Sequence, residues 1–106
     1  MDFDSVGEII ATRRFHFVDE GNHQRTVSVF LGKPQQPNGS SDYHCLFQVI
    51  GIGSQQTQSA RGHDSIQALQ TAMLLIGVRL SNLNNEIGGK LSWDGGAEGE
   101  LGFPLV

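Results

Sequence analysis

The sequence has only one cysteine, and its 106 residues contain no long hydrophobic run. A lone Cys45 can form no intramolecular disulfide, so a buried thiol in a reducing compartment is expected. No stretch approaches the roughly 20 apolar residues that cross a bilayer. The first residues lack the basic and apolar regions of a signal peptide. We therefore expect a cytoplasmic protein that does not enter a membrane.

Positive charge is scarce as well. Seven Lys and Arg stand against 11 Asp and Glu, which gives a formal net charge of −4. The basic residues are scattered along the chain, whereas binding through nucleic-acid phosphates normally needs a clustered basic face. We therefore expect no nucleic-acid partner.

What the sequence does contain is a set of short segments with alternating polarity, which is the pattern of half-buried strands. These segments are Ile9–Val18, Arg25–Leu31 and Tyr43–Ile52. Turn residues between the first two predict a hairpin. Gln55–Ser59 is polar on both faces, so it is predicted to be an edge strand at best. Within the first segment Arg13 interrupts the apolar side, and we expect its stem to lie along the sheet with the guanidinium at the rim.

A long helix is predicted from Asp64 onward. Asp64 is a favourable N-cap and Gln67 follows three residues later, as in a capping box. An apolar stripe then recurs at spacings of three and four residues. Its members are Ile66, Leu69, Met73, Ile76, Leu80, Leu83 and Ile87. Asn and Gly residues predict that the helix ends between residues 82 and 87.

These elements predict one α+β domain over residues 1–106. Its antiparallel sheet should have about four to five strands, with the long helix packed on one face. Residues 90–93 are expected to form a short late strand. A Gly-rich acidic loop and an apolar tail should follow it.

The predicted helix carries more apolar residues than one sheet can cover. Projected at about 100° per residue, Leu74, Leu75 and Val78 lie away from the main stripe. Either the C-terminal tail folds over this second face or another protein chain does. The tail residues available are Trp93, Leu101, Phe103 and Leu105. Gly77 would permit a close approach in either case.

No catalytic, cofactor or metal site is predicted. The four histidines, which are His16, His23, His44 and His63, lack the paired spacing of metal ligands. A ligand site on the polar sheet face is a weak alternative. It would use Arg14, His16 and His44, provided that their strands are neighbours.

Two further segments have competing interpretations. At the predicted helix start the Asp64 carboxylate competes with any bound anion, so it is interpreted as a cap. The acidic residues Asp94, Glu98 and Glu100 match no calcium-loop template. They are interpreted as a solvated loop, with a basic partner as the alternative.

Several short motifs resemble an uncharacterised family of small bacterial proteins. They are Gly62-His63-Asp64-Ser65-Ile66-Gln67-Ala68-Leu69, Gly51-Ile52-Gly53, Leu91-Ser92-Trp93 and Leu101-Gly102-Phe103-Pro104. The resemblance covers most of the chain and also includes Gly32-Lys33-Pro34 before a Cys45-bearing strand. It implies a bacterial origin and a shared fold, and it carries no activity or catalytic residue.

The sequence therefore favours a protein-interaction module, such as an immunity or antitoxin-like protein that occludes a partner. The small acidic chain, the surplus apolar helix face and the missing catalytic constellation support this hypothesis. Two alternatives stay open. One is a ligand-binding or enzymatic domain with a pocket on the polar sheet face, and the other is a homodimeric scaffold joined through Leu74 and Val78.

Overall fold

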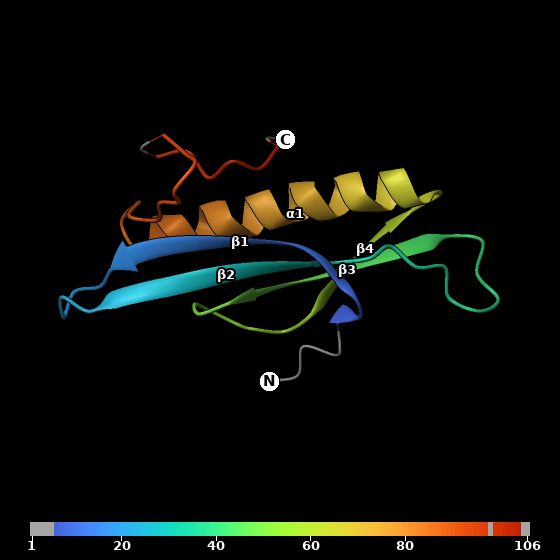
Figure 1. Ribbon diagram of the computed structural model, residues 1–106, viewed down its shortest axis with the longest axis horizontal. Coiled ribbons are helices and arrows are strands. Elements are labelled where there is room, and N and C mark those ends of the chain that lie inside the picture. The colour runs from blue at the N-terminus through green and yellow to red at the C-terminus, as the bar shows by residue number, and fades with distance from the viewer. Residues whose placement is uncertain (1–5, 98, 105–106) are drawn as a thin grey trace.

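Four antiparallel strands and one helix make up the fold (Figure 1). The computed structural model of the chain describes residues 6–97 and 99–104. The elements are β1 (Ile9–Val18), β2 (Gln24–Gly32), β3 (Tyr43–Ile50), β4 (Gln58–Gly62) and α1 (Ser65–Glu86). The strands lie side by side in the order of the chain, β1-β2-β3-β4. The predicted α+β fold with a helix on an antiparallel sheet is confirmed.

The β1–β2 hairpin follows the alternation of the sequence. Phe15 pairs with Val27 and Arg13 with Val29, so these residues share the face that turns toward the helix. Asn22 makes the turn with a positive φ of 62°, a conformation that Asn tolerates. At the other end of the hairpin the register shifts between Ile9 and Ala11, which marks a β-bulge.

The two later strands differ from the predicted bounds. β3 ends at Ile50 and not at residue 52, because Gly51 has a φ of 110° that turns the chain away. β4 begins three residues later than predicted. Gln55 belongs to the loop, where its side chain accepts a hydrogen bond from Gly51 N and its carbonyl accepts one from Gln48 Nε2.

The predicted cap of α1 is confirmed. Asp64 Oδ1 accepts a hydrogen bond of 2.7 Å from Gln67 N. Gln67 Oε1 accepts one of 2.6 Å from His63 N, one residue ahead of the cap. Glu86 is the last helical residue, and Gly89 N then donates to Asn84 O at 2.8 Å.

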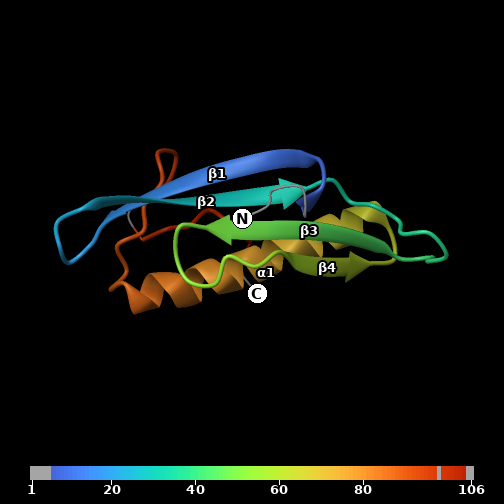
Figure 2. The same ribbon diagram turned by 90° about the horizontal axis from the view of Figure 1, so that it is seen from below.

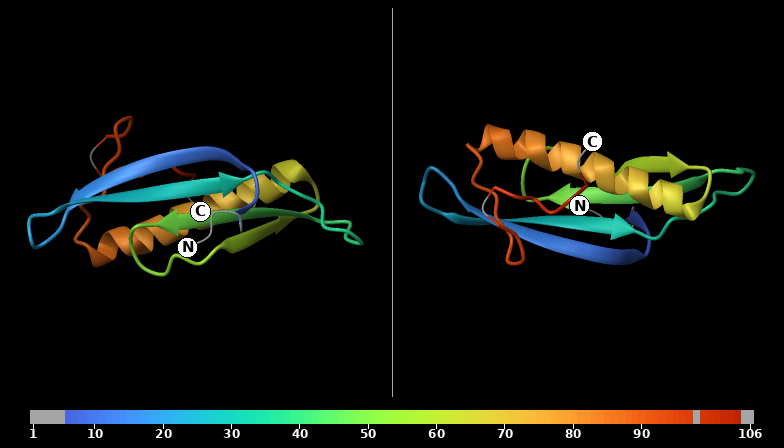
Figure 3. Two further views of the ribbon diagram at one scale, coloured as in Figure 1. Left: turned by 60° about the horizontal axis from the view of Figure 1, so that its bottom comes forward. Right: turned by 90° about the horizontal axis from the view of Figure 1, so that it is seen from above.

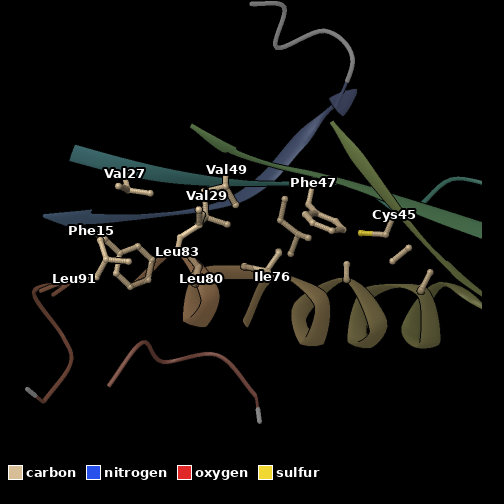
Figure 4. Packing of buried hydrophobic residues seen from close by; sticks show 14 residues of the cluster. Phe15, Val27, Val29, Cys45, Phe47, Val49, Ile76, Leu80, Leu83 and Leu91 are labelled. Atoms are coloured by element: carbon tan, nitrogen blue, oxygen red, sulfur yellow. The ribbon is translucent and has the colours of Figure 1, made fainter. Parts of the chain in front are cut away.

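The buried stripe of α1 differs from the predicted one in its first half. Ile66 was expected in the core and is 65 % exposed, whereas Ala68 and Ala72 are fully buried. At this end the helix lies so close to β4 that a Cβ on Gly62 would overlap Ala68 N. Only small side chains fit there. Larger residues fill the core farther along, where Ile76, Leu80 and Leu83 meet the sheet (Figure 4).

Helix α1 packs on β3 and β4, as the view from below shows (Figure 2). The corresponding face of β1 and β2 is left to the segment that follows the helix, which crosses over from the end of α1 toward β1 (Figure 3). The expected late strand is reduced to one bridge, in which Ser92 pairs with His16 of β1. Within the described residues no helix is both long and apolar enough to cross a membrane.

Candidate functional site

The C-terminal segment is anchored to β1 through Arg13. The Arg13 guanidinium carbon lies 3.7 Å from the centroid of a Trp93 ring and 5.2 Å from that of Phe103. Arg13 Nη1 also donates a 2.9 Å hydrogen bond to Gly102 O. The charge is thus held by two aromatic faces and a carbonyl. The guanidinium of Arg13 was expected at the sheet rim. It lies under the C-terminal segment, and the sequence did not predict this contact.

The glycines of this segment surround Trp93. A Cβ at Gly95, Gly96 or Gly102 would overlap atoms of the Trp93 side chain. Trp93 Nε1 donates to Glu100 O at 3.2 Å, which closes the loop over the ring. Asp94 and Glu100 are exposed, as expected of a solvated loop, and the glycines of this segment wrap one aromatic side chain. The signal in the sequence for this wrapping was a single Trp followed by several glycines. Glu98 lies outside the described residues.

The same segment rests on one flank of α1. A Cβ at Gly77 would lie 3.0 Å from Pro104 O and 3.3 Å from Phe103 Cβ, so the lack of a side chain permits this contact. Phe103 also packs beside Phe15, with 6.5 Å between the ring centroids. Tail packing, one of the two predicted alternatives, is therefore present on the flank of α1 that faces β1. Leu105 lies outside the described residues.

The opposite flank of α1 stays open. Leu75 is 42 % exposed and Val78 is 44 % exposed, whereas Leu74, which lies toward the side of Gly77, is half-buried. A shallow groove of about 290 Å³ brings Leu75 and Val78 beside Gln58, the first residue of β4. Within the described residues, the tail packing at Gly77 does not extend to this flank. We call Leu75, Val78 and the outer edge of β4 the β4–α1 surface.

The outer edge of β4 presents unpaired main-chain groups. His44 of β3 exchanges its backbone hydrogen bonds with Gln35, at 2.7 and 2.8 Å, on the side away from β4. The pair of His44 with Arg61 is therefore a non-hydrogen-bonded one. By alternation, the N–H and C=O groups of Arg61 and of Ser59 point outward from the sheet. No strand of the described chain lies against this edge.

The other edge of the sheet is bridged at one residue and carries a bulge. On β1 the backbone of His16 pairs with Ser92, through bonds of 2.8 and 3.0 Å. The bulge between Ile9 and Ala11 further disrupts the regular edge. Bulges and covering segments are common ways to block edge pairing, and β4 has neither.

The three residues of the predicted ligand site do not form one cluster. Arg14 and His16 share the outer face of β1, opposite Ser28 and Thr26 of β2. His44 lies on β3 opposite Arg61, and Ser28 pairs with Ile50 at the far end of that strand. Six strand residues, or about 20 Å, therefore separate His44 from the row of Arg14.

The lone thiol is buried in the core. Cys45 has no exposed surface and its Sγ donates to Gly32 O at 3.3 Å. Burial raises the pKa of Cys45, which disfavours the thiolate. In residues 6–97 and 99–104 no group of three His, Cys, Asp or Glu side chains could hold a metal ion.

One small pocket opens beside Arg13. It has a volume of about 130 Å³ and is lined mainly by apolar residues of β1, β2, α1 and the C-terminal segment, including Val29, Leu31, Met73 and Phe103. Pockets for drug-sized ligands commonly reach about 300 to 1,000 Å³. The volume beside Arg13 falls below that range.

The fold and these surfaces define a small α+β domain with a four-stranded antiparallel sheet, a helix on one face and, within the described residues, an open edge at β4. The chain belongs to the family described as Domain of unknown function (DUF6968), whose model matches residues 11–105. An uncharacterised family, as the sequence motifs indicated, is thereby confirmed. No curated protein and no solved structure matches the chain.

Proposed function

We propose that this protein is a protein-binding module that works through the β4–α1 surface. The observation that carries the proposal is the coincidence of two unpartnered features at one place. An open strand edge lies next to the exposed apolar side chains of Leu75 and Val78. Open edges pair readily with another strand, and apolar side chains beside them add buried area.

The contrast with the rest of the molecule supports this choice of surface. The other strand edge is bridged by Ser92, and the opposite flank of α1 lies under Phe103 and Pro104. Proteins commonly blunt edges that must not pair. A domain that bridges and bulges one edge, covers one helix flank, and leaves the β4 edge and the flank beside it bare, is suited to receive a partner there.

The proposal is tested by placing the photo-crosslinker benzoylphenylalanine at position 78 of the full chain, expressed in its native host. Irradiation should give a discrete crosslinked protein product. Position 18 is the matched control, because Val18 is 47 % exposed against 44 % for Val78 and lies at the end of β1. Crosslinking from position 18 should give no such product.

A second variant tests whether the product depends on the surface. Adding Leu75→Glu to the chain that carries the crosslinker should remove the product, because a charge then faces the buried side of the interface. The proposal is overturned by equal products from positions 18 and 78, or by no discrete product from position 78.

A more specific role belongs to the same proposal. The acidic, loop-rich chain fits an immunity or antitoxin-like protein that occludes a basic partner, and identifying the crosslinked protein would test this role. A bacterial origin and a cytoplasmic location are further predictions from the sequence. The alternative of a ligand pocket built from Arg14, His16 and His44 receives no support from their spacing along the sheet.

A further inference from the structure

We propose that the partner at the β4–α1 surface is a second copy of this chain, related by a two-fold axis that passes beside Ala60. This inference rests on the proposed function and names its partner. The two β4 strands would pair antiparallel, so that two four-stranded sheets join into one continuous sheet.

The main-chain groups of β4 are arranged symmetrically for such a pair. The outward-facing residues, Ser59 and Arg61, flank Ala60 on either side. A two-fold axis at Ala60 places Ser59 of one copy opposite Arg61 of the other, and the reverse. Because both residues point their N–H and C=O groups outward, the two pairs form four hydrogen bonds. An isologous contact requires this kind of self-complementarity.

The side chains of β4 permit the same register. Directly opposite like charges destabilise paired strands. Arg61 is the charged residue of β4, and in this register it faces Ser59 and not a second Arg61. Gln58 faces Gly62, and Ala60 faces its own copy. No side chain of β4 has to change its conformation for the two edges to pair.

The position of α1 gives the right spacing for helix contact. The helix packs on both β3 and β4, and we place its axis about half a strand spacing inside the edge. Neighbouring strands are about 4.8 Å apart, so two such helices across a β4 pair lie about 10 Å apart. That value agrees with the packing distance of about 8 to 10 Å between helices. Leu75 lies on the flank that would meet its copy, and Val78 borders that flank, farther from the sheet.

The two helices would run antiparallel in this arrangement. Gly62 lies against Ala68, and two strand residues correspond to about four helix residues, so Ala60 is level with Ala72. A two-fold axis at that level brings Arg79 of each copy to the level of Asp64 of the other. Within its own chain Arg79 Nη2 donates to Ser54 O and Asp64 Oδ1 accepts from Gln67 N, so a contact between the two copies would use their remaining polar atoms. The antiparallel helices also oppose their dipoles favourably.

The test measures the mass of the full chain by light scattering after size-exclusion chromatography, over a series of protein concentrations. The expected mass is twice that of one chain. Ser59→Pro should give a monomer, because proline removes an outward N–H that does not pair with β3. Ser59→Ala is the matched control and should remain a dimer, because it leaves the main chain unchanged.

A second pair of variants tests the helix contact. Val78→Glu should give monomers, and Val18→Glu, the same change at an equally exposed Val on β1, should leave the dimer intact. Circular dichroism verifies that each variant is folded. If Ser59→Pro does not fold, amide hydrogen exchange of the wild type decides the strand contact, since Arg61 N–H should be protected only at concentrations that give the dimer.

The outcomes separate this inference from the proposed function. A wild-type chain that stays monomeric at every concentration overturns the second copy as partner, while a crosslink from position 78 to a different protein still supports a protein-binding module. Dimers that persist in both Ser59→Pro and Val78→Glu overturn the β4–α1 surface as the contact. A fast-exchanging Arg61 N–H in the dimer overturns the strand pairing.

Discussion

The two flanks of α1 differ in what covers them. One flank contacts apolar residues of the C-terminal segment, and the other carries apolar side chains that no described segment covers. On the flank toward β1, Gly77 lies under Phe103 and Pro104. On the flank toward β4, Leu75 and Val78 are more than two-fifths exposed. The difference arises because the C-terminal segment is anchored by Trp93 on Arg13, at the β1 side of the molecule. One anchoring contact thus decides which helix flank is left for a partner.

The largest expected contrast concerns thiol reactivity inside and outside the core. Cys45 is fully buried, whereas Ile66 in the first turn of α1 is 65 % exposed. Alkylation of Cys45 should need an opening of the core, which costs about 5 kcal/mol or more. In native buffer its rate with a maleimide should therefore be about a thousandfold or more below that of Ile66→Cys in a Cys45→Ala chain.

The control for this measurement is the same reaction in denaturant, where the two thiols should react at similar rates. Comparable rates in native buffer would show that the core around Cys45 opens easily. The buried thiol of Cys45 would then be as accessible to the reagent as a thiol at the exposed position 66.

Truncating Trp93, which anchors the C-terminal segment on Arg13, should lower the stability of the fold far more than truncating a residue on the open flank of α1. We expect Trp93→Ala to lower the free energy of unfolding by about 3 kcal/mol, because the contacts with Arg13 and the wrapped glycines are lost. Leu75→Ala should change it by less than about 0.5 kcal/mol, since an exposed side chain is removed. Urea unfolding, at a dilution where the chain is monomeric, measures both. Equal losses would contradict the difference between the two flanks.

The close approach at Gly77 offers a graded test. Gly77→Val should destabilise the fold by about 2 kcal/mol, because its branched side chain meets Phe103 and the carbonyl of Pro104. Gly77→Ala should have an effect near zero, since the gain in helix propensity of about 1 kcal/mol offsets the tight contact. Thermal and urea unfolding compare the two variants. If Val is tolerated as well as Ala, the tail does not rest on this flank.

The smallest expected effect lies in the hairpin, away from both flanks. The pKa of Asp19 lies below its ordinary value of 3.8, chiefly because the carboxylate accepts a hydrogen bond from the backbone of His23, with Arg25 contributing. A depressed pKa stabilises the folded state above the unfolded pKa, and this contribution is lost as the pH falls through the folded pKa. Wild type should therefore be slightly more stable than Asp19→Asn at neutral pH.

Unfolding curves between neutral and acid pH measure this difference. It should disappear in acid as Asp19 becomes protonated. A difference that is independent of pH would assign the effect to the turn geometry and not to the charge. Both flanks of α1 should be unaffected by the substitution.

Local signals explain which elements the sequence predicted well. The cap at Asp64 and the helical periodicity depend on residues close together in the chain, and α1 begins and ends where they indicated. Alternation predicted β1 to β3 for the same reason. β4 was displaced, because a strand with polar residues on both faces has no alternation to mark its bounds. Ile66 was assigned to the core because periodicity does not record how closely a helix approaches its sheet.

The candidate surface was predicted in part. Helical projection separated Leu75 and Val78 from the main stripe, and both are exposed. The projection did not reveal that the tail would cover the neighbouring flank and leave these residues bare. The open edge of β4, with Ser59 and Arg61 facing outward, depends on the register with β3 and on the bond pattern of His44.

The sequence by itself determined the elements and the apolar surplus on one helix, because capping, turn chemistry and periodicity act over a few residues. The tertiary structure alone decided where that surplus is covered. Arg13 and Trp93 are far apart in the chain, and their contact fixes the C-terminal segment on the β1 side. The residues left open on the β4 side are a consequence of that long-range packing, which no local pattern encodes.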